Sequence, residues 1–386
     1  MAPLRIGIIA AEPSGDLLAA GLMNALRERL PAVQFEGVAG PLMRKVGIDQ
    51  WENMDSLSVM GLFEVLQHLP RLLRLRSRVM SRWRDKPPAV FIGVDAPDFN
   101  LTLECQLREA GVPTVHYVSP TVWAWRTGRV RKIRRAVDLL LTIFPFEKDF
   151  LVGRDVPVRY VGHPLACDMP LQPDRPAARA ALGLDADRPV LAVLPGSRRS
   201  EVDRLARPFL QTAVRLKREL AELQLVVPLV SEATQRLFEE QRTRTAPDLA
   251  LVTASGGSRL ALAAADVVLT ASGTATLEGL LSKRPMVVGY KLNAATYYAA
   301  RLFRLVKVEH VAMANLLAGE RLAPELLQGE CEPDHLLPPL RRFFDNAALR
   351  DEIAARYRDI HMALRMDTNR EAAAAVVGLL EGRGLV

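Results

Sequence analysis

The sequence predicts an α/β protein of two Rossmann-like, doubly wound domains that face a cleft. Its 386 residues match the usual length of two domains, and 49% of them are hydrophobic, which is enough for two buried cores. Short apolar runs alternate with helical patterns along the chain, as in parallel sheets flanked by helices. A segment rich in Pro, Ala, Asp and Arg separates two such series. We therefore expect a first domain over residues 1–168, a linker over 169–189, a second domain over 190–345 and helices alone over 346–386.

The first series of apolar runs begins within the first ten residues, without the anatomy of a signal peptide. Helical patterns at Asp16–Arg29 and Leu101–Ala110 separate some of these runs. The strands expected in this domain are Arg5–Ala10, Gln34–Val38, Val90–Val94, Thr114–Val118, Leu139–Ile143 and Val158–Tyr160. Together they predict one parallel sheet.

The second series repeats the same alternation. Helices are expected at Arg204–Leu220 and Glu232–Thr243. The strands expected here are Val190–Leu194, Gln224–Pro228, Ala250–Thr253, Val267–Thr270 and Pro285–Tyr290. Ligands bind such sheets at the carboxyl ends of the strands, so the loops at those ends are the candidate binding loops.

The net charge of +7 is concentrated in two segments. Residues 71–86 and 126–135 each carry a net charge of +6, so the rest of the chain is acidic. This distribution predicts anionic partners at two surfaces. A nucleic-acid partner is not expected, because no recognition motif accompanies the basic segments. No apolar run approaches the roughly 18–20 residues that a membrane span needs.

The number and spacing of the cysteine and histidine residues predict neither a disulfide framework nor a metal site. The three cysteines, Cys105, Cys167 and Cys331, are scattered and form no CxxC pair, which favours a cytoplasmic protein. No histidine pair has the spacing of metal ligands. We therefore expect no metal and no cofactor.

Two loops of the second domain are candidates for binding a nucleotide diphosphate. Gly196, Ser197 and Arg198 follow one strand, and the turn at 271–274 follows another and opens a helix. Such a turn directs backbone N–H groups and the positive end of a helix at one point. Glu278 lies one helical turn further on, within reach of a ribose hydroxyl. The alternative is that both are ordinary strand-to-helix turns.

In the first domain, Asp95 is the candidate general base. It stands where a strand ends, and Pro97 prevents the strand from continuing, so its carboxylate would be held rigidly. The alternative is an aspartate that stabilises the turn. Ser14, Gly15 and Asp16 follow the first strand and are candidates for contact with a ligand, or form an N-cap alone.

Two further segments of the first domain suggest contact with a sugar or a membrane. Trp123 and Arg126 follow a strand, where an indole ring can stack on a sugar, lie at a lipid interface or pack in the core. Residues 58–76 are amphipathic and end in arginines, as in a helix on an anionic leaflet, or in a core helix with a solvated basic face. Their membrane-facing candidates are Val59, Met60, Leu62, Phe63, Leu66, Leu69, Leu72 and Leu73.

These motifs together resemble the lipid-A-disaccharide synthases. The similar blocks run in order along most of the chain and include AAEPSGD (10–16), GVAGPLM (37–43), VMGLFEVL (59–66), IGVDAPDFN (92–100), HYVSPTVWAWR (116–126), FPFEKDF (144–150), LPGSRRSEV (194–202), ASGTATLE (271–278) and NLLAGE (315–320). Ala11 departs from the glycine that is usual in the first block. The resemblance implies a B-type glycosyltransferase fold (GT-B) that acts without a metal.

The resemblance also implies a reaction and its site. UDP-2,3-diacylglucosamine would be joined, with inversion, to 2,3-diacylglucosamine 1-phosphate (lipid X), which gives lipid A disaccharide 1-phosphate and UDP. Asp95 would be the base on the acceptor 6-hydroxyl, and Glu278 would bind the ribose. Asn315 would lie near the nucleotide. The diphosphate would be bound by Gly196, Ser197, Arg198, Ser272, Gly273, Thr274 and Thr276.

The location and assembly implied by the resemblance are those of a peripheral protein on the cytoplasmic face of the inner membrane. The C-terminal helices would pack back on the first domain or be exchanged between the subunits of a homodimer. Two other functions remain open at this point. One is a UDP-N-acetylglucosamine 2-epimerase-like enzyme of the same fold, and the other is a membrane-docking protein without enzymatic activity.

Overall fold

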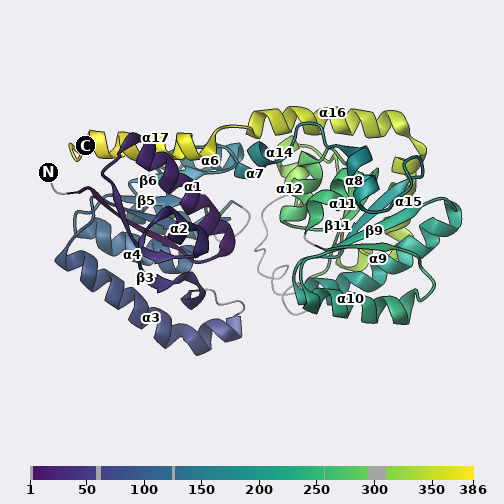
Figure 1. The fold of residues 1–386 in the computed structure, drawn as a ribbon, viewed down its shortest axis with the longest axis horizontal. Helices are drawn as coiled ribbons and strands as arrows, with labels where there is room; N and C mark the ends of the chain where they lie inside the picture. Colours follow the sequence, from purple (N-terminus) through teal and green to yellow (C-terminus); the bar gives the residue numbers. More distant parts are fainter. Residues whose placement is uncertain (1–2, 58–61, 124–126, 256, 294–309) are drawn as a thin grey trace. The chain divides into compact units, whose positions relative to one another are not determined.

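The computed structural model divides the chain into two compact units. Unit 1 comprises Met1–Pro164 and Leu364–Val386, and unit 2 comprises Leu165–Ala363 (Figure 1). The structure describes residues 3–57, 62–123, 127–255, 257–293 and 310–386. Among these, no helix is both long and apolar enough to cross a bilayer.

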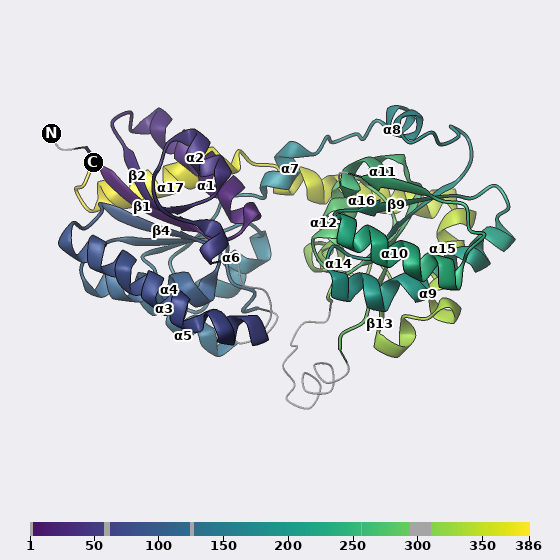
Figure 2. The same ribbon diagram turned by 60° about the horizontal axis from the view of Figure 1, so that its bottom comes forward.

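Unit 1 is built on a seven-stranded parallel sheet in the order β3-β2-β1-β4-β5-β6-β7. Its strands are β1 (Arg5–Ala10), β2 (Gln34–Ala39), β3 (Asp49–Asn53), β4 (Val90–Val94), β5 (Thr114–Tyr117), β6 (Leu139–Thr142) and β7 (Val158–Tyr160). Its helices are α1 (Pro13–Arg29), α2 (Pro41–Val46), α3 (Leu62–Asp85), α4 (Pro97–Glu109), α5 (Val130–Ala136), α6 (Pro145–Val152) and α17 (Thr368–Gly382), with short 3-10 turns at Met54–Ser56 and Thr127–Arg129. Helices α1, α2 and α17 cover one face of the sheet, and α3, α4 and α5 cover the other (Figure 2).

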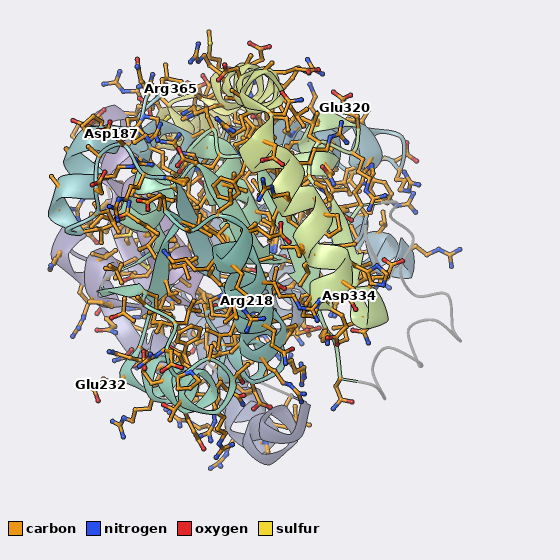
Figure 3. All side chains as sticks on the ribbon, turned by 90° about the vertical axis from the view of Figure 1, so that its right-hand side faces the viewer. Asp187, Arg218, Glu232, Glu320, Asp334 and Arg365 are labelled. Atoms are coloured by element: carbon orange, nitrogen blue, oxygen red, sulfur yellow. The ribbon has the colours of Figure 1, made fainter. Side chains whose placement is uncertain are left out.

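Unit 2 repeats this design with a six-stranded parallel sheet in the order β10-β9-β8-β11-β12-β13. Its strands are β8 (Val190–Leu194), β9 (Gln224–Leu229), β10 (Val252–Ser255), β11 (Val267–Ala271), β12 (Met286–Tyr290) and β13 (Glu325–Leu327). Its helices are α8 (Arg175–Ala181), α9 (Arg199–Glu219), α10 (Glu232–Thr245), α11 (Ser258–Ala264), α12 (Thr274–Leu281), α14 (Met313–Ala318), α15 (Pro333–Asp345) and α16 (Ala347–Leu364). A 3-10 turn lies at Gln328–Glu330, and α7 (Pro164–Asp168) begins at the unit boundary. The charged residues Asp187, Arg218, Glu232 and Asp334, which are labelled in Figure 3, are exposed on the surface of the unit.

The predicted fold class, α/β with two doubly wound parallel sheets, is confirmed. In both sheets the strand order reverses beside the first strand of the unit, between β1 and β4 and between β8 and β11. In open parallel sheets, ligands bind outside the carboxyl ends of the strands at this reversal. The fold therefore points to the loops after β1 and β4 and to those after β8 and β11.

The structure differs from the sequence-based expectations at the sheet edges and at helix starts. Strands β3 and β13 were not predicted, because they are short edge strands without an apolar run. Helix α4 begins at Pro97 and α1 at Pro13, earlier than expected, with proline at the first turn in each. Proline suits that position because the first N–H groups of a helix have no partner within it.

The expected linker and the C-terminal helix α17 both pack closely on the units. Residues 169–189, expected as a linker, contain α8, whose Arg179 is buried and donates to Ala264 O and to Asp266 in unit 2. At the C-terminus, α17 packs on α1 in unit 1. A Cβ on Gly21 would lie 2.3 Å from Asn369 Oδ1, so glycine permits this close approach.

Candidate active site

In unit 2, the two predicted loops line one cavity of about 470 Å³ at the carboxyl ends of β8, β11 and β12. The cavity is lined by Leu194, Gly196, Ser197, Arg198, Glu201, Pro228, Val230, Gly257, Ser258, Ala271, Ser272, Gly273, Thr274, Ala275, Glu278 and Tyr290. The loops lie more than seventy residues apart in the sequence, and they meet because β8 pairs with β11. The cavity therefore stands at the strand reversal of unit 2.

The loop after β8 is shaped by Glu201 in the first turn of α9. Its Oε2 accepts the N–H groups of Ser197 and Arg198, at 3.1 and 3.2 Å. Gly196 has φ of +118°, and a Cβ there would lie 2.5 Å from Glu201 Cβ, so the turn requires glycine. Because the carboxylate occupies both amides, an anion at this loop would meet the Arg198 side chain, which is 68% exposed, and the exposed Ser197.

The loop after β11 leads into α12, whose N-cap residue is Gly273, a residue without a side chain that could cap the helix. Gly273 has φ of +116° and precedes Thr274, the first residue of the helix. Uncapped N–H groups and the helix dipole favour an anion at this end. Glu278 also faces the cavity, where its Oε2 accepts a hydrogen bond from the Ser258 hydroxyl.

Two predicted binding residues of unit 2 lie behind the cavity and do not line it. Thr276 is fully buried, and its hydroxyl donates to Gly273 O and accepts from Met313 N. Asn315 is fully buried as well, and its amide bonds to Ala323 and Glu325. Both side chains use their polar atoms to hold the loops, so the structure places them as supports of the cavity wall.

In unit 1, Asp95 follows β4 in a strained turn. Asp95 and Ala96 have φ of 52° and 44°, in the left-handed region that residues other than glycine rarely adopt, at a cost of roughly 1–3 kcal/mol each. The Asp95 N–H donates to Tyr117 O at 2.8 Å. Pro97 then opens α4. The half-buried Asp95 is thereby held at the carboxyl end of β4, beside the strand reversal of unit 1.

Asp95 lines a cavity of about 340 Å³ with an apolar wall. The wall is made by leucines of α3, of which Leu69 and Leu73 are 41% and 44% exposed. The lining residues are Ala11, Glu12, Leu57, Leu69, Leu72, Leu73, Arg76, Asp95, Ala96, Pro97, Asp98 and Phe99. Three of the predicted membrane-facing residues, Leu69, Leu72 and Leu73, thus line the same cavity as the candidate base. Val59 and Met60 lie outside the described residues, and so do the side chains of Leu62, Phe63 and Leu66.

Asp16, predicted to contact a ligand or cap its own helix, is instead a buried cap of α2. Its carboxylate accepts the N–H groups of Gly40, Leu42 and Met43 at 2.8–3.1 Å. Helix α1 has already begun at Pro13. The neighbouring Gly15 is buried against Val94, and Ser14 is exposed. Of the three predicted residues, Ser14 alone is accessible to a ligand.

Replacing Asp16 with alanine is expected to destabilise unit 1 by about 3 kcal/mol or more, because three buried or half-buried N–H groups lose their acceptor. Thermal and urea unfolding measure this loss. The exposed Asp85, at the end of α3, offers a control in which Asp85→Ala leaves the unfolding free energy almost unchanged. Wild-type stability of Asp16→Ala would contradict the capping role.

Trp123 is half-buried and packs inward after β5, which agrees with the core alternative for this residue. Its Nε1 donates to Glu147 Oε1 at 3.3 Å, and its ring packs edge-on against Phe146. Burial raises the pKa of Glu147 to about 8, against the opposing effect of hydrogen bonds from Phe144 N–H and Trp123. Burial also lowers the pKa of His163 to about 4. The side chains of Glu147 and His163 are therefore mostly neutral at pH 7. Arg126, the other residue predicted in this segment, lies outside the described residues.

Glu147→Gln is expected to gain stability relative to wild type as the pH rises from about 4.5 to about 8. In that window folded Glu147 holds a proton that the unfolded chain releases, so wild-type stability falls with rising pH, and the variant lacks this dependence. Unfolding free energies at pH 5 and pH 8 measure the effect. Asp149→Asn on the exposed face of α6 should show no such trend. A difference between Glu147→Gln and wild type that does not change with pH would contradict the buried neutral carboxyl.

Among the residues that the structure describes, no group of three His, Cys, Asp or Glu side chains is arranged to hold a metal ion. The charged groups that face the two cavities are instead Arg198, Glu201 and Glu278 in unit 2, and Glu12, Arg76, Asp95 and Asp98 in unit 1.

Comparison with known proteins decides the family. The model of the lipid-A-disaccharide synthetase family matches residues 6–377. The chain belongs to this family. It is 49% identical to the lipid-A-disaccharide synthase of Aeromonas hydrophila over 380 residues, covering 98% of this chain and 99% of that protein. It is 48% identical to the synthase of Serratia proteamaculans over 377 residues, with 98% of each chain covered.

Membership in the lipid-A-disaccharide synthetase family makes the chain a glycosyltransferase of lipid A biosynthesis, a role that fits the enterobacterial relatives. A non-enzymatic docking protein is thereby excluded.

Solved structures show the fold alone. They include a putative UDP-N-acetylglucosamine 2-epimerase from Listeria monocytogenes, with a TM-score of 0.64 and 11% identity over 98% of this chain and 95% of that one. Anabaena HepE in complex with UDP and glucose has a TM-score of 0.58 and 12% identity over 97% and 99%.

Proposed function

We propose that this lipid-A-disaccharide synthetase transfers 2,3-diacylglucosamine from its UDP derivative to the 6-hydroxyl of lipid X, with inversion at the anomeric carbon. The observation that carries the proposal is the position of Asp95, a carboxylate in a strained turn beside a leucine-lined cavity. An inverting transfer needs a base at the acceptor hydroxyl and a stabilised leaving group. Asp95 is proposed as the base, and UDP as the leaving group.

The donor is proposed to bind in the unit 2 cavity. Arg198 and the uncapped N-terminus of α12 supply positive charge for the diphosphate, and Glu278 offers a carboxylate to the ribose hydroxyls. A cavity of about 470 Å³ has the size of ordinary ligand pockets. Anabaena HepE, which has a similar fold, was solved with UDP and glucose, and this supports a UDP site in the proposal.

The acceptor is proposed to bind in the unit 1 cavity, because that cavity combines three kinds of group. Leu69, Leu72 and Leu73 offer apolar surface to an acyl chain, Arg76 offers a cation to the 1-phosphate, and Asp95 stands beside both. A ligand with acyl chains, a phosphate and a reacting hydroxyl matches this combination. The apolar wall gives no comparable reason to bind a soluble sugar.

We also propose that α3 holds the protein on the cytoplasmic face of the inner membrane. Its exposed leucines, Leu69 and Leu73, lie in the same helix as the basic segment 71–86, and both features favour an anionic lipid surface. A homodimer that exchanges α17 is part of the proposal as well. In the structure α17 packs on unit 1 of its own chain, through an apolar face that includes Ala372, Val376 and Leu380. Exchange would place this same face on unit 1 of the second subunit.

The experiment that tests the proposed function is a transfer assay in mixed micelles with EDTA. We expect UDP-2,3-diacylglucosamine and lipid X to give lipid A disaccharide 1-phosphate and UDP, measured by mass spectrometry. UDP-N-acetylglucosamine should not be epimerised in a parallel reaction, since the epimerases are similar to this chain in fold alone. Epimerisation without disaccharide formation would overturn the proposal.

A further inference from the structure

A buried polar cluster lies directly behind Asp95. It consists of Gly93 in β4, Asn100 and Glu104 in α4, and His116 in β5, and we call it the Gly93 cluster. Gly93 pairs with His116 across the two strands, and Glu104 Oε1 lies 2.7 Å from His116 Nδ1. Asn100, Glu104 and His116 are all fully buried. The cluster therefore joins the start of α4 to the ends of both strands beside the candidate base.

Glycine at position 93 makes the space for this cluster. A Cβ there would lie 2.2 Å from Glu104 Oε1 and 2.9 Å from Asn100 Cβ, which is closer than real contacts allow. Both side chains of α4 thus reach over the backbone of β4 where any other residue would exclude them. Asp95 lies two residues after Gly93 in the sequence.

Asn100 connects the Gly93 cluster to the Asp95 backbone. Its Nδ2 donates to Asp95 O at 2.9 Å, and the Asp95 N–H donates to Tyr117 O at 2.8 Å. Both polar groups of the Asp95 backbone are therefore held, one by the cluster and the other by the residue that follows His116. Such restraint is needed here because Asp95 and Ala96 both keep a positive φ.

The buried polar groups of the cluster lower the stability of the fold, and close packing alone does not explain why they are there. Among the described residues, Asn100 Oδ1, Glu104 Oε2 and His116 Nε2 are buried without a hydrogen-bond partner. Buried polar groups of this kind destabilise a fold, and apolar side chains of similar shape would avoid the penalty. A requirement for one geometry of the Asp95 turn explains why the amide of Asn100 stands there.

We propose that Asn100 is a positioning residue for the transfer, and that it sets the direction in which the Asp95 carboxylate points. The inference rests on the proposed role of Asp95 as the base. Asn100 acts through the peptide group between Asp95 and Ala96, because that group carries the carbonyl that Asn100 binds. Loss of the hydrogen bond lets the turn relax from its positive φ angles and moves the carboxylate away from the acceptor hydroxyl.

The test compares Asn100→Leu and Asn100→Ala with wild type. Leucine keeps the branched shape of asparagine without a donor, and alanine removes the side chain without overpacking. We expect kcat for disaccharide formation to fall by about 10²-fold while KM for both substrates stays near the wild-type value, since misplacement of a reacting group costs rate rather than binding. Hydrogen exchange of the Asp95 amide should become faster, and UDP affinity should not change. Gln106→Ala, on the exposed face of α4, is the matched control and should keep wild-type kcat.

The outcomes separate the inference from the proposed function. If either Asn100 variant folds, as judged by its melting temperature and UDP affinity, and keeps both wild-type kcat and wild-type exchange of the Asp95 amide, the inference is overturned. An equal loss of kcat in Gln106→Ala also overturns it. If the wild-type protein forms no disaccharide, the proposed function fails, and faster exchange of the Asp95 amide in the Asn100 variants still supports the positioning of the turn.

Discussion

Asp95→Asn is expected to lower kcat of disaccharide formation by about 10²–10⁴-fold, the usual contribution of a general base. The amide has the same shape as the carboxylate, and it cannot accept the proton of the acceptor hydroxyl. The turn itself should persist, because its backbone hydrogen bonds to Tyr117 and Asn100 do not involve the Asp95 side chain. Steady-state transfer kinetics with UDP-2,3-diacylglucosamine and lipid X measure the effect.

A matched control for this substitution is Glu109→Gln, which makes the same chemical change on the exposed end of α4. Glu109→Gln should keep wild-type kcat. UDP affinity, measured by calorimetry, should be the same in Asp95→Asn as in wild type, since the cavity proposed for UDP is lined by residues of unit 2. A folded Asp95→Asn protein with wild-type kcat would exclude Asp95 as the base.

Arg198→Ala is expected to lower kcat/KM by about 10²–10³-fold, the usual effect of removing one group that stabilises developing negative charge. In the proposed transfer, negative charge develops on the diphosphate as UDP leaves, and Arg198 lines the cavity together with the start of α12. The amides of Ser197 and Arg198 cannot replace it, because both are bound to Glu201. Transfer kinetics and UDP binding together measure the loss.

Arg199→Ala provides the control for Arg198→Ala, because Arg199 is the adjacent exposed arginine and does not line the cavity. Its kinetics should match wild type. We further expect Arg198→Ala to weaken the binding of UDP more than the binding of uridine, which has no phosphate. If the substitution lowered the affinities for UDP and for uridine by equal factors, Arg198 would not contact the diphosphate.

Local sequence patterns were sufficient to predict the two sheets and the position of the candidate site. Apolar runs of four to six residues marked the central strands, since a strand buried on both faces needs them. Asp95 and the loops at 196–198 and 271–278 were predicted because each directly follows such a strand. The edge strands β3 and β13 were missed because strands at an edge do not need that pattern.

The roles of individual polar side chains depended on contacts between distant segments. Asp16 belongs to α1 by sequence, and it caps α2 because the fold brings Gly40 beside it. Asn315 lies in α14, which packs on α12 beside the loop at 271–274, although its polar atoms all face inward to Ala323 and Glu325.

The amino-acid sequence by itself determined the fold class, the family and the loops that form the candidate site, because apolar periodicity and local motifs are properties of neighbouring residues. The tertiary structure alone decided which polar side chains face a cavity and which hold the framework. Glu147 and the Gly93 cluster show the reason. Their burial, the raised pKa of Glu147 and the fit of Glu104 over Gly93 arise from groups that the sheet and helices bring together across the sequence.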